Sequence, residues 1–263
     1  MKIYDNALVS RKAQLADDVV IGHQAVIGDN VVIGSGTKIG AFCVIDGNTV
    51  IGKNCEIFTG AVIGSQPQDL KYKGEKSFLE IGDNNIIREY CTFNVGTGEG
   101  GKTVVGSNNL FMAYSHVAHD CRVGNHCVIA NSGTLAGHVT LEDKVVVGGL
   151  AAIHQFVNVG KLSIIGGLSK VIKDIPPFST CDGHPAQVYG LNLVGLRRSN
   201  VSKESMHELK HAFTILFNSG LSGSHALEAL KKENLMSEEC RHLVCFIENS
   251  QRGISGSCRQ KDK

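Results

Sequence analysis

The sequence contains no tryptophan, and aromatic residues make up only 6% of its 263 residues. Basic and acidic side chains nearly balance, at 26 against 25, so the chain lacks the broad positive surface that nucleic acid binding requires. No apolar run approaches the roughly 20 residues of a membrane-spanning helix. The first residues show no apolar core with a cleavage site, so we expect no signal peptide. These absences predict a soluble, cytoplasmic protein without a nucleic acid partner.

The nine cysteines include no CxxC pair, and their number is odd. A disulfide framework would need an even set with regular spacing, and a structural zinc site would need paired cysteines. We therefore expect reduced thiols that are mostly buried, as in a reducing compartment.

Glycine is abundant, and it recurs beside a regular series of aliphatic residues. Reading every sixth position gives an apolar residue in three runs, from Val9 to Ile63, from Ile81 to Phe93 and from Val105 to Val171. A period of six is neither the 3.6 of a helix nor the 2 of a simple strand. It predicts short strands joined by tight turns, with one side chain of each strand in a shared core. Glycine then occupies positions that a side chain would obstruct.

Three hexads form a triangular coil of 18 residues, and successive coils stack at the usual interstrand spacing of about 4.8 Å. The sequence is long enough for roughly nine such coils. The predicted fold class is therefore mainly β, a parallel β-helix of hexapeptide repeats.

The pattern changes to helical spacing in the last quarter of the chain. Apolar residues at this spacing follow Ser202, a residue type that caps helix N-termini. A second short helix is predicted around residues 226–230 and a third after Ser237. We expect residues 254–263 to be frayed, as chain ends often are.

These observations divide the chain into two domains. We place the β-helix at residues 1–190 and a small α-helical domain at residues 191–263. The period of six breaks near residues 65–78 and 97–103, and we interpret both breaks as loops that leave the coil.

Because each coil has 18 residues, residues whose numbers differ by 18 stack in one column. The spacing of the histidines in the sequence therefore predicts their positions on the coil. One column contains His119, Gly137 and Gln155, and the adjacent column contains Asp120, His138 and Phe156. With His116 and His154 beside these columns, four histidines gather on one face within about 10 Å.

This cluster has the groups that acyl transfer needs. An imidazole near its ordinary pKa suits proton abstraction at neutral pH, which makes His119 a candidate base. Gly137, stacked below it, can present an unobstructed backbone N–H to a developing oxyanion. Each histidine also has a simpler interpretation as a solvated corner residue, which we favour for His126, outside the columns.

Two other functions fit a coil of this kind. Several histidines on hexapeptide coils bind zinc in the γ-class carbonic anhydrases, and the period does not separate a zinc hydratase from a transferase. A structural or ice-binding solenoid would need threonine ladders, which the sequence lacks.

Several segments are more specific than the hexad, namely HVAHDCRVGN, LAGHVTL, GGLAAIHQFVNVG, DIPPFSTCDG, GLNLVGLRRS and the loop IGSQPQDLKYKGE. In these segments the chain resembles the family of UDP-N-acetylglucosamine O-acyltransferases that begins lipid A synthesis. The resemblance covers nearly the whole chain. It implies a left-handed coil, a homotrimer with active sites between subunits, and no metal or dissociable cofactor.

The resemblance also implies a mechanism. His119 would take the proton from the glucosamine 3-hydroxyl of UDP-N-acetylglucosamine as that oxygen attacks the thioester of a 3-hydroxyacyl carrier protein. Asp120 would orient the imidazole, and the Gly137 amide would stabilise the oxyanion. These three residues are the predicted catalytic group.

The family's substrate contacts match further positions in this sequence. The predicted substrate-binding residues are Asp69, Lys71, His116, His138, His154, Gln155, Asn192 and Arg198. Gly167 matches the residue that measures acyl-chain length, and a glycine there implies an open groove and a longer acyl group.

The chain departs from the family pattern at some positions. Asn94 and Val95 replace a histidine and an arginine that are common there, and Val194 replaces an acidic residue. These departures leave O-acylation and acylation of a UDP 3-amino sugar both open. Because the carrier protein is acidic, we expect a basic docking surface, for which an ordinary helix surface is the alternative. The candidate residues are Arg197, Arg198, Lys203, Lys210, Lys231 and Lys232.

Overall fold

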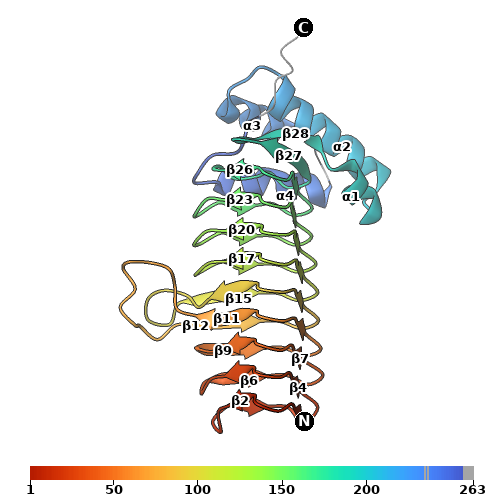
Figure 1. Cartoon of the computed structure of the whole chain (residues 1–263). Helices are drawn as coiled ribbons and strands as arrows, with labels where there is room; N and C mark the ends of the chain where they lie inside the picture. The colour runs from red at the N-terminus through yellow and green to blue at the C-terminus, as the bar shows by residue number, and fades with distance from the viewer. Residues whose placement is uncertain (234, 236, 257–263) are drawn as a thin grey trace.

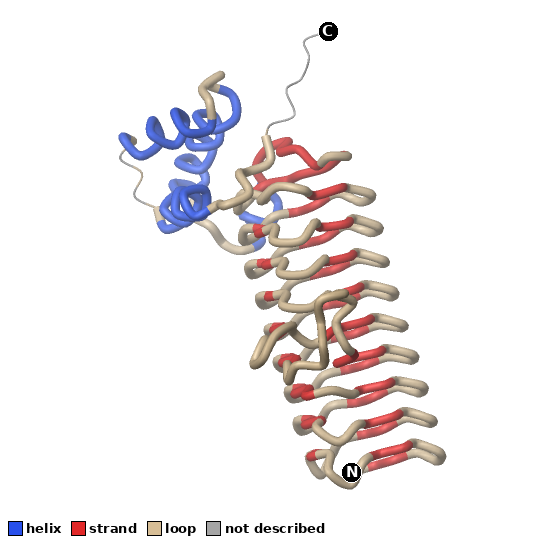
Figure 2. Tube along the Cα trace, turned by 90° about the vertical axis from the view of Figure 1, so that its left-hand side faces the viewer, coloured by secondary structure: helices blue, strands red, loops and turns tan. Residues whose placement is uncertain are grey.

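The computed structural model describes residues 1–233, 235 and 237–256. Figure 1 shows a tall stack of short strands with helices at its C-terminal end, and Figure 2 shows the stack from one side. No helix in these described ranges is long and apolar enough to cross a membrane. The predicted fold class is confirmed, since the chain forms a left-handed parallel β-helix with a small helical part.

The coil has three faces, each of which is a sheet. The first sheet contains β1 (Lys2–Ile3), β4 (Val20–Ile21), β7 (Lys38–Ile39), β10 (Glu56–Ile57), β13 (Ile86–Ile87), β16 (Leu110–Phe111), β19 (Val128–Ile129), β22 (Val146–Val147), β25 (Ile164–Ile165), β27 (Ser179–Gly183) and β28 (Ala186–Leu191). The second sheet contains β2 (Leu8–Val9), β5 (Val26–Ile27), β8 (Val44–Ile45), β11 (Val62–Ser65), β14 (Thr92–Asn94), β17 (His116–Val117), β20 (Thr134–Leu135), β23 (Ala152–Ile153) and β26 (Lys170–Val171). The third sheet contains β3 (Gln14–Leu15), β6 (Val31–Ile33), β9 (Asn48–Ile51), β12 (Phe78–Ile81), β15 (Lys102–Val105), β18 (Arg122–Val123), β21 (Thr140–Leu141) and β24 (Asn158–Val159).

The register of these strands confirms the 18-residue coil. His116 pairs with Thr134, and Thr134 pairs with Ala152. The hexad residues point inward, and those from Ile21 to Val171 are buried. The core of the coil is therefore a stack of aliphatic side chains, one from each strand.

Three corners join the sheets, and most of the site residues discussed below lie at one of them. The first corner, between the first and second sheets, contains Tyr114 and Gly167. The second corner, between the second and third sheets, contains His119. The third corner, between the third and first sheets, contains Lys144 and Leu162.

Glycine occurs where one coil closely approaches the next, as predicted. A Cβ on Gly22 would lie 2.7 Å from the backbone nitrogen of Ala41 in the coil above, which no side chain can tolerate. The left-handed backbone of the corners is instead adopted by larger residues, including Asp120, His138 and Phe156 with φ of 58°, 60° and 65°.

A hairpin that the sequence did not predict closes the stack. β27 continues the parallel first sheet beside β25, and β28 then returns antiparallel to β27. The strands run to Leu191.

The helices are α1 (Leu193–Arg198), α2 (Lys203–Phe213), α3 (Gly223–Lys232) and α4 (Glu238–Asn249), and a π-helical turn, η1 (Thr214–Asn218), continues α2. The predicted caps are confirmed, because Ser202 accepts a hydrogen bond from the backbone of Ser205 and Ser237 accepts one from Cys240. The short helix α1 was not predicted.

The end of the described chain is bound to the coil, so the prediction of fraying is wrong for residues 254–256. Ile254 forms a β-bridge with Asp174, whose carbonyl accepts a hydrogen bond from Ser255 at 2.8 Å. The carbonyl of Gly256 accepts another from Val188. The rest of the predicted frayed segment, and of the helical domain that we extended to residue 263, lies outside the described residues.

Candidate functional site

Both interruptions of the hexad leave the coil at the second corner, where His119 also lies. The first loop, residues 66–77, follows β11, and the second loop, residues 95–101, follows β14. Figures 1 and 2 show the two loops next to each other on the side of the coil. Hydrogen bonds join them, because the backbone N–H of Lys76 donates to the Glu99 carboxylate and the N–H of Gly100 donates to the Lys76 carbonyl.

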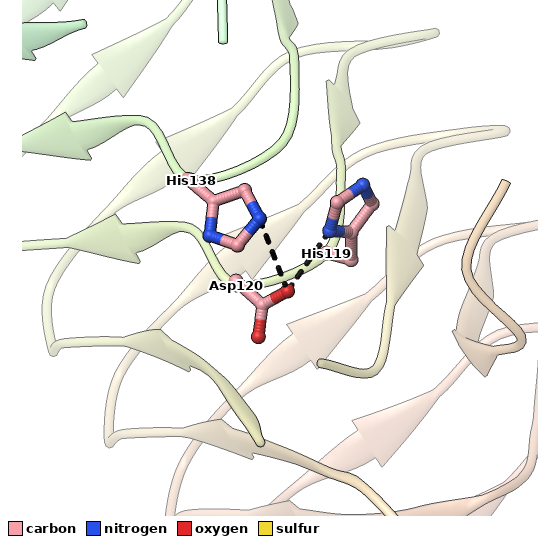
Figure 3. Close-up of side chains that lie close together, drawn as sticks. All are labelled: His119, Asp120 and His138. Atoms are coloured by element: carbon pink, nitrogen blue, oxygen red, sulfur yellow. Dashed lines mark hydrogen bonds and ion pairs between the residues drawn. The ribbon is translucent and has the colours of Figure 1, made fainter. Parts of the chain in front are cut away.

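The centre of the site is a carboxylate between two imidazoles (Figure 3). Asp120 Oδ2 lies 2.9 Å from His119 Nδ1 and 3.7 Å from His138 Nε2. The side chains of His119 and Asp120 are each 14% exposed, so this hydrogen bond is largely shielded from water. The predicted columns are confirmed, since His138 lies one coil above Asp120 and its backbone N–H donates to the His119 carbonyl.

Asp120 is held by two threonines that the sequence did not single out. The backbone N–H of Thr97 donates to both carboxylate oxygens at 3.1 Å, and the Thr97 hydroxyl donates to Oδ2 at 2.6 Å. The Thr103 hydroxyl accepts from the Asp120 N–H. Burial alone would raise the pKa of Asp120, but the hydrogen bonds from Thr97 and His119 outweigh burial and hold the pKa below its ordinary value. Asp120 is therefore ionised at neutral pH.

The ionised carboxylate fixes the state of its neighbour. A carboxylate only accepts hydrogen bonds, so the neutral His119 ring carries its proton on Nδ1 and leaves a lone pair on Nε2. The ring also lies against Gly137, whose added Cβ would come within 2.6 Å of Nε2. Within the described residues, the N–H of Gly137 has no hydrogen-bond acceptor.

His116 lies beside this group on the outer face of the second sheet. Its Nδ1 shares a hydrogen bond of 2.7 Å with the Thr92 hydroxyl one coil below. Burial lowers the pKa of His116, and the charge of His119 lowers it further. His116 is therefore neutral and suited to hydrogen bonding with an uncharged ligand group.

The other predicted residues of the second corner are more open. His154 and Gln155 are exposed, and His154 Nδ1 lies 3.2 Å from the carbonyl of Gln155. Phe156 stacks on His138 with ring centres 4.5 Å apart. His126 is exposed at the third corner, as its simpler interpretation predicted.

Asp69 and Lys71 lie on the first loop. Asp69 Oδ1 accepts a hydrogen bond from the Lys71 backbone, which forms a tight turn, and the Lys71 side chain is exposed. Both residues are available to a ligand.

Three predicted residues lie at other corners of the same chain. Asn192 caps α1 and donates its amide to the Leu162 carbonyl at the third corner, where Lys144 also contacts Ser199 at the end of α1. Arg198, in the last turn of α1, is exposed. Gly167 is exposed at the first corner. One chain therefore does not bring these residues to His119.

Asn192 differs from the other predicted contacts in being buried. Its Oδ1 accepts from the Gly195 N–H, and its amide nitrogen donates to Leu162, so both ends of the side chain already have partners. Its visible role is to position α1.

The central group is also the one cluster of metal-ligand type among the described residues. Ligand atoms of His119, Asp120 and His138 all lie within 4.8 Å of one another. Two imidazoles and a carboxylate are a familiar zinc set, so the zinc alternative has a specific location. The three hydrogen bonds from Thr97 and the one from His119 already occupy the carboxylate.

Known proteins are similar to this chain over most of its length. Residues 174–255 match the family model described as UDP-N-acetylglucosamine O-acyltransferase, domain 2, and residues 30–65 and 102–137 match bacterial transferase hexapeptide repeats. The acyl-[acyl-carrier-protein]–UDP-N-acetylglucosamine O-acyltransferase of Alkalilimnicola ehrlichii is 50% identical over 189 residues, covering 72% of this chain and 73% of the relative.

Solved structures extend the match along the chain. The UDP-N-acetylglucosamine acyltransferase from Campylobacter jejuni is 42% identical, with a TM-score of 0.91 and coverage of 97% of this chain and 99% of that one. The Francisella novicida enzyme is 38% identical, with a TM-score of 0.94 and coverage of 98% and 95%. The chain belongs to the acyl-[acyl-carrier-protein]–UDP-N-acetylglucosamine O-acyltransferase family.

Within this acyltransferase family, the structure gives one of the chain's departures a clear local role. Asn94, where family members often carry histidine, is buried and donates its amide to the Ser65 hydroxyl and the Gln66 carbonyl. It thereby ties down the beginning of the first loop. Val95 is buried in the core.

Proposed function

We propose that this acyltransferase moves a 3-hydroxyacyl group from acyl carrier protein to the 3-hydroxyl of UDP-N-acetylglucosamine, the first step of lipid A synthesis. The observation that carries the proposal is the His119–Asp120 pair. Its hydrogen bond directs the Nδ1 proton to the carboxylate and leaves Nε2 as a base beside the Gly137 N–H.

The steps follow from these positions. Nε2 of His119 takes the proton from the sugar 3-hydroxyl while that oxygen attacks the thioester carbon. The N–H of Gly137 stabilises the oxyanion that forms on the thioester oxygen. When the tetrahedral intermediate collapses, the C–S bond breaks, and the leaving thiolate receives the proton from His119. Asp120 stays ionised throughout and stabilises the transient imidazolium.

The remaining residues would hold the substrates. His116 on the second sheet, with His138, His154 and Gln155 at the second corner, would contact the sugar and the nucleotide. Asp69 and Lys71 on the first loop would contact the sugar and a phosphate. Arg198 would contact the nucleotide, with α1 positioned by Asn192. Gly167 would set acyl length and, lacking a side chain, admit a longer acyl group.

The distribution of the predicted site residues over three separate corners supports a homotrimer. Asn192 and Arg198 lie at the third corner and Gly167 at the first, so no single chain places them beside His119. Parallel coils related by a threefold axis would bring a corner of one subunit against the second corner of the next. Light scattering should then give three times the chain mass, and a monomer should be inactive.

The carrier protein would dock on basic residues of the helices. Arg197, Arg198, Lys203 and Lys210 are exposed there, as are Lys231 and Lys232. Lys231 forms an ion pair with Glu248, so the other five are better placed to meet an acidic partner. We also place the enzyme in the cytoplasm, which the eight described cysteines support because all are unpaired.

The test is acyl transfer from a panel of 3-hydroxyacyl carrier proteins to UDP-N-acetylglucosamine and to its 3-amino counterpart. His119→Ala should reduce kcat by about a hundredfold to ten-thousandfold while circular dichroism shows an intact coil. His126→Ala is the matched control, an exposed histidine at another corner, and should keep full activity. Equal activity of both variants would refute the His119 mechanism.

The same preparations separate the alternatives. Transfer only to the amino sugar would assign N-acylation. Stoichiometric zinc with carbon dioxide hydration, and no acyl transfer, would assign the zinc hydratase instead.

A further inference from the structure

The second loop contacts the site at the carboxylate of Asp120. Among the described residues that contact this carboxylate, only Thr97 donates more than once, through its N–H and its hydroxyl. Thr103, just after the loop, accepts from the Asp120 N–H. Asp120 is therefore held by Thr97 in the second loop and by Thr103 just after it, and the regular coils have no such loop.

The shape of the loop depends on glycines that allow this contact. A Cβ on Gly101 would lie 1.7 Å from the carbonyl oxygen of Thr97, and one on Gly96 would lie 2.4 Å from the backbone nitrogen of Lys102. Gly98 and Gly100 have φ of 68° and 75°, the left-handed region that favours glycine. The sequence between Thr97 and Lys102 thus folds back tightly enough to return the chain to the coil.

The loop is also linked to the substrate-binding side of the corner. Glu99 accepts a hydrogen bond from Lys76, and Gly100 donates to the Lys76 carbonyl. Lys76 ends the same first loop that carries Asp69 and Lys71. The first loop is therefore joined by hydrogen bonds to residues 99–100, and the backbone of the second loop connects these to Thr97, which bonds Asp120.

From this arrangement we infer that Thr97 is a positioning residue for the His119–Asp120 pair. It touches neither reacting group. Its three hydrogen bonds fix the carboxylate so that Oδ2 faces Nδ1 of His119, and they disperse the negative charge that would otherwise raise the proton affinity of the imidazole. The inference rests on the proposed base role of His119.

The other titratable groups around the pair are His116, His138 and Cys121. His138 favours the ionised carboxylate, as Thr97 does. Burial keeps the thiol of Cys121 neutral, with its pKa raised to about 12. Removing the Thr97 hydroxyl leaves these groups in place, so a change in the pH profile would report on Thr97 itself.

The experiment compares Thr97→Val, which removes the hydroxyl but keeps the backbone N–H and the side-chain shape, with Thr97→Ser, which restores a hydroxyl. Thr140→Val is the matched control, because Thr140 on β21 is a partly exposed threonine whose hydroxyl has no hydrogen-bond partner in the described part of the chain. Thr97→Val should lower kcat by about tenfold to a hundredfold, leave KM for the UDP sugar nearly unchanged, and move the acidic limb of the pH profile to higher pH. Thr97→Ser should recover most of the rate.

A second readout does not require activity. Nitrogen-15 NMR of the His119 ring should show a higher titration midpoint in Thr97→Val than in the wild type. Wild-type protein without acyl transfer would refute the proposed function, and the ring titration would still decide the role of Thr97. Kinetics and ring titration in Thr97→Val that match those of Thr140→Val would overturn the inference.

Discussion

The imidazole of His119 lies against Gly137 of the next coil. A Cβ on that glycine would come within 2.5 Å of Cε1 and 2.6 Å of Nε2. The backbone of Gly137 is not in the left-handed region, so the glycine is required by the neighbouring ring and not by its own dihedral angles. The position of the His119 ring therefore depends on the absence of a side chain one coil away.

Gly137→Ala should reduce kcat by about a hundredfold, because the methyl group would push the ring from its position and small misplacements of a catalytic group are costly. Gly223→Ala is a suitable control, since a Cβ there meets nothing within 4 Å. Steady-state kinetics with a thermal melt would check the prediction. A fully active Gly137→Ala enzyme would show that the ring can move without loss.

Asp120→Asn should lower kcat by more than about a hundredfold, because the amide nitrogen would face a donor in either orientation. It would meet the Thr97 N–H in the place of Oδ1, or the Thr97 hydroxyl and His119 Nδ1 in the place of Oδ2. The substitution should also destabilise the fold by about 1–3 kcal/mol at neutral pH. The native pKa of Asp120 is depressed, so the stabilisation is present above the unfolded pKa of about 3.9 and is lost as pH falls through the native value. Urea denaturation should therefore show the variant and wild type converging as the pH falls below the unfolded pKa of about 3.9. A stability difference that does not change with pH would contradict this account.

Asn94→Ala should loosen the first loop, because Ser65 and Gln66 would lose the amide that bonds both. We expect a KM for the UDP sugar that rises about threefold to tenfold, and a stability loss of about 1–3 kcal/mol. Hydrogen exchange should show faster exchange in residues 66–77. Unchanged exchange there, with unchanged KM, would mean that the loop is held by its other contacts.

His242 on α4 should make the attachment of the helices to the coil pH dependent. Its Nε2 lies 2.7 Å from the Glu142 carboxylate, and this hydrogen bond raises the pKa of His242 despite partial burial. The neighbouring Lys161 lowers the pKa slightly and Glu238 raises it. A raised histidine pKa stabilises the fold below about pH 6.5 and stops doing so as pH rises through the native value.

The effect should be small, because the two side chains are 36% and 29% exposed and water screens the pair. We expect the wild type to lose no more than about 1 kcal/mol between pH 6 and pH 8, and His242→Gln to lose less over the same range. Melting temperatures at the two pH values measure this directly. An equal loss in both proteins would assign the pH dependence to other groups.

The repeat of six determined the coil and much of the site, because a strictly periodic chain has one register. Once 18 residues make a coil, His119 must lie under Gly137, Asp120 must lie under His138, and His116 must pair with Thr134, as the structure shows. The helix caps Ser202 and Ser237 were predictable for a similar reason, since capping depends only on neighbours in sequence.

Where the repeat of six stops, the sequence no longer predicts which residues contact each other. The contact of Thr97 with Asp120, the bonds between the two loops, the packing of α1 at the third corner and the return of the chain end to Asp174 all join residues through loops of irregular length. No spacing rule fixes the path of such a segment, so only the folded chain reveals its partners. The sequence alone therefore determined the coil and the column of His119, and the tertiary structure decided how the His119–Asp120 pair is held, because that depends on segments whose positions are set by packing and not by repetition.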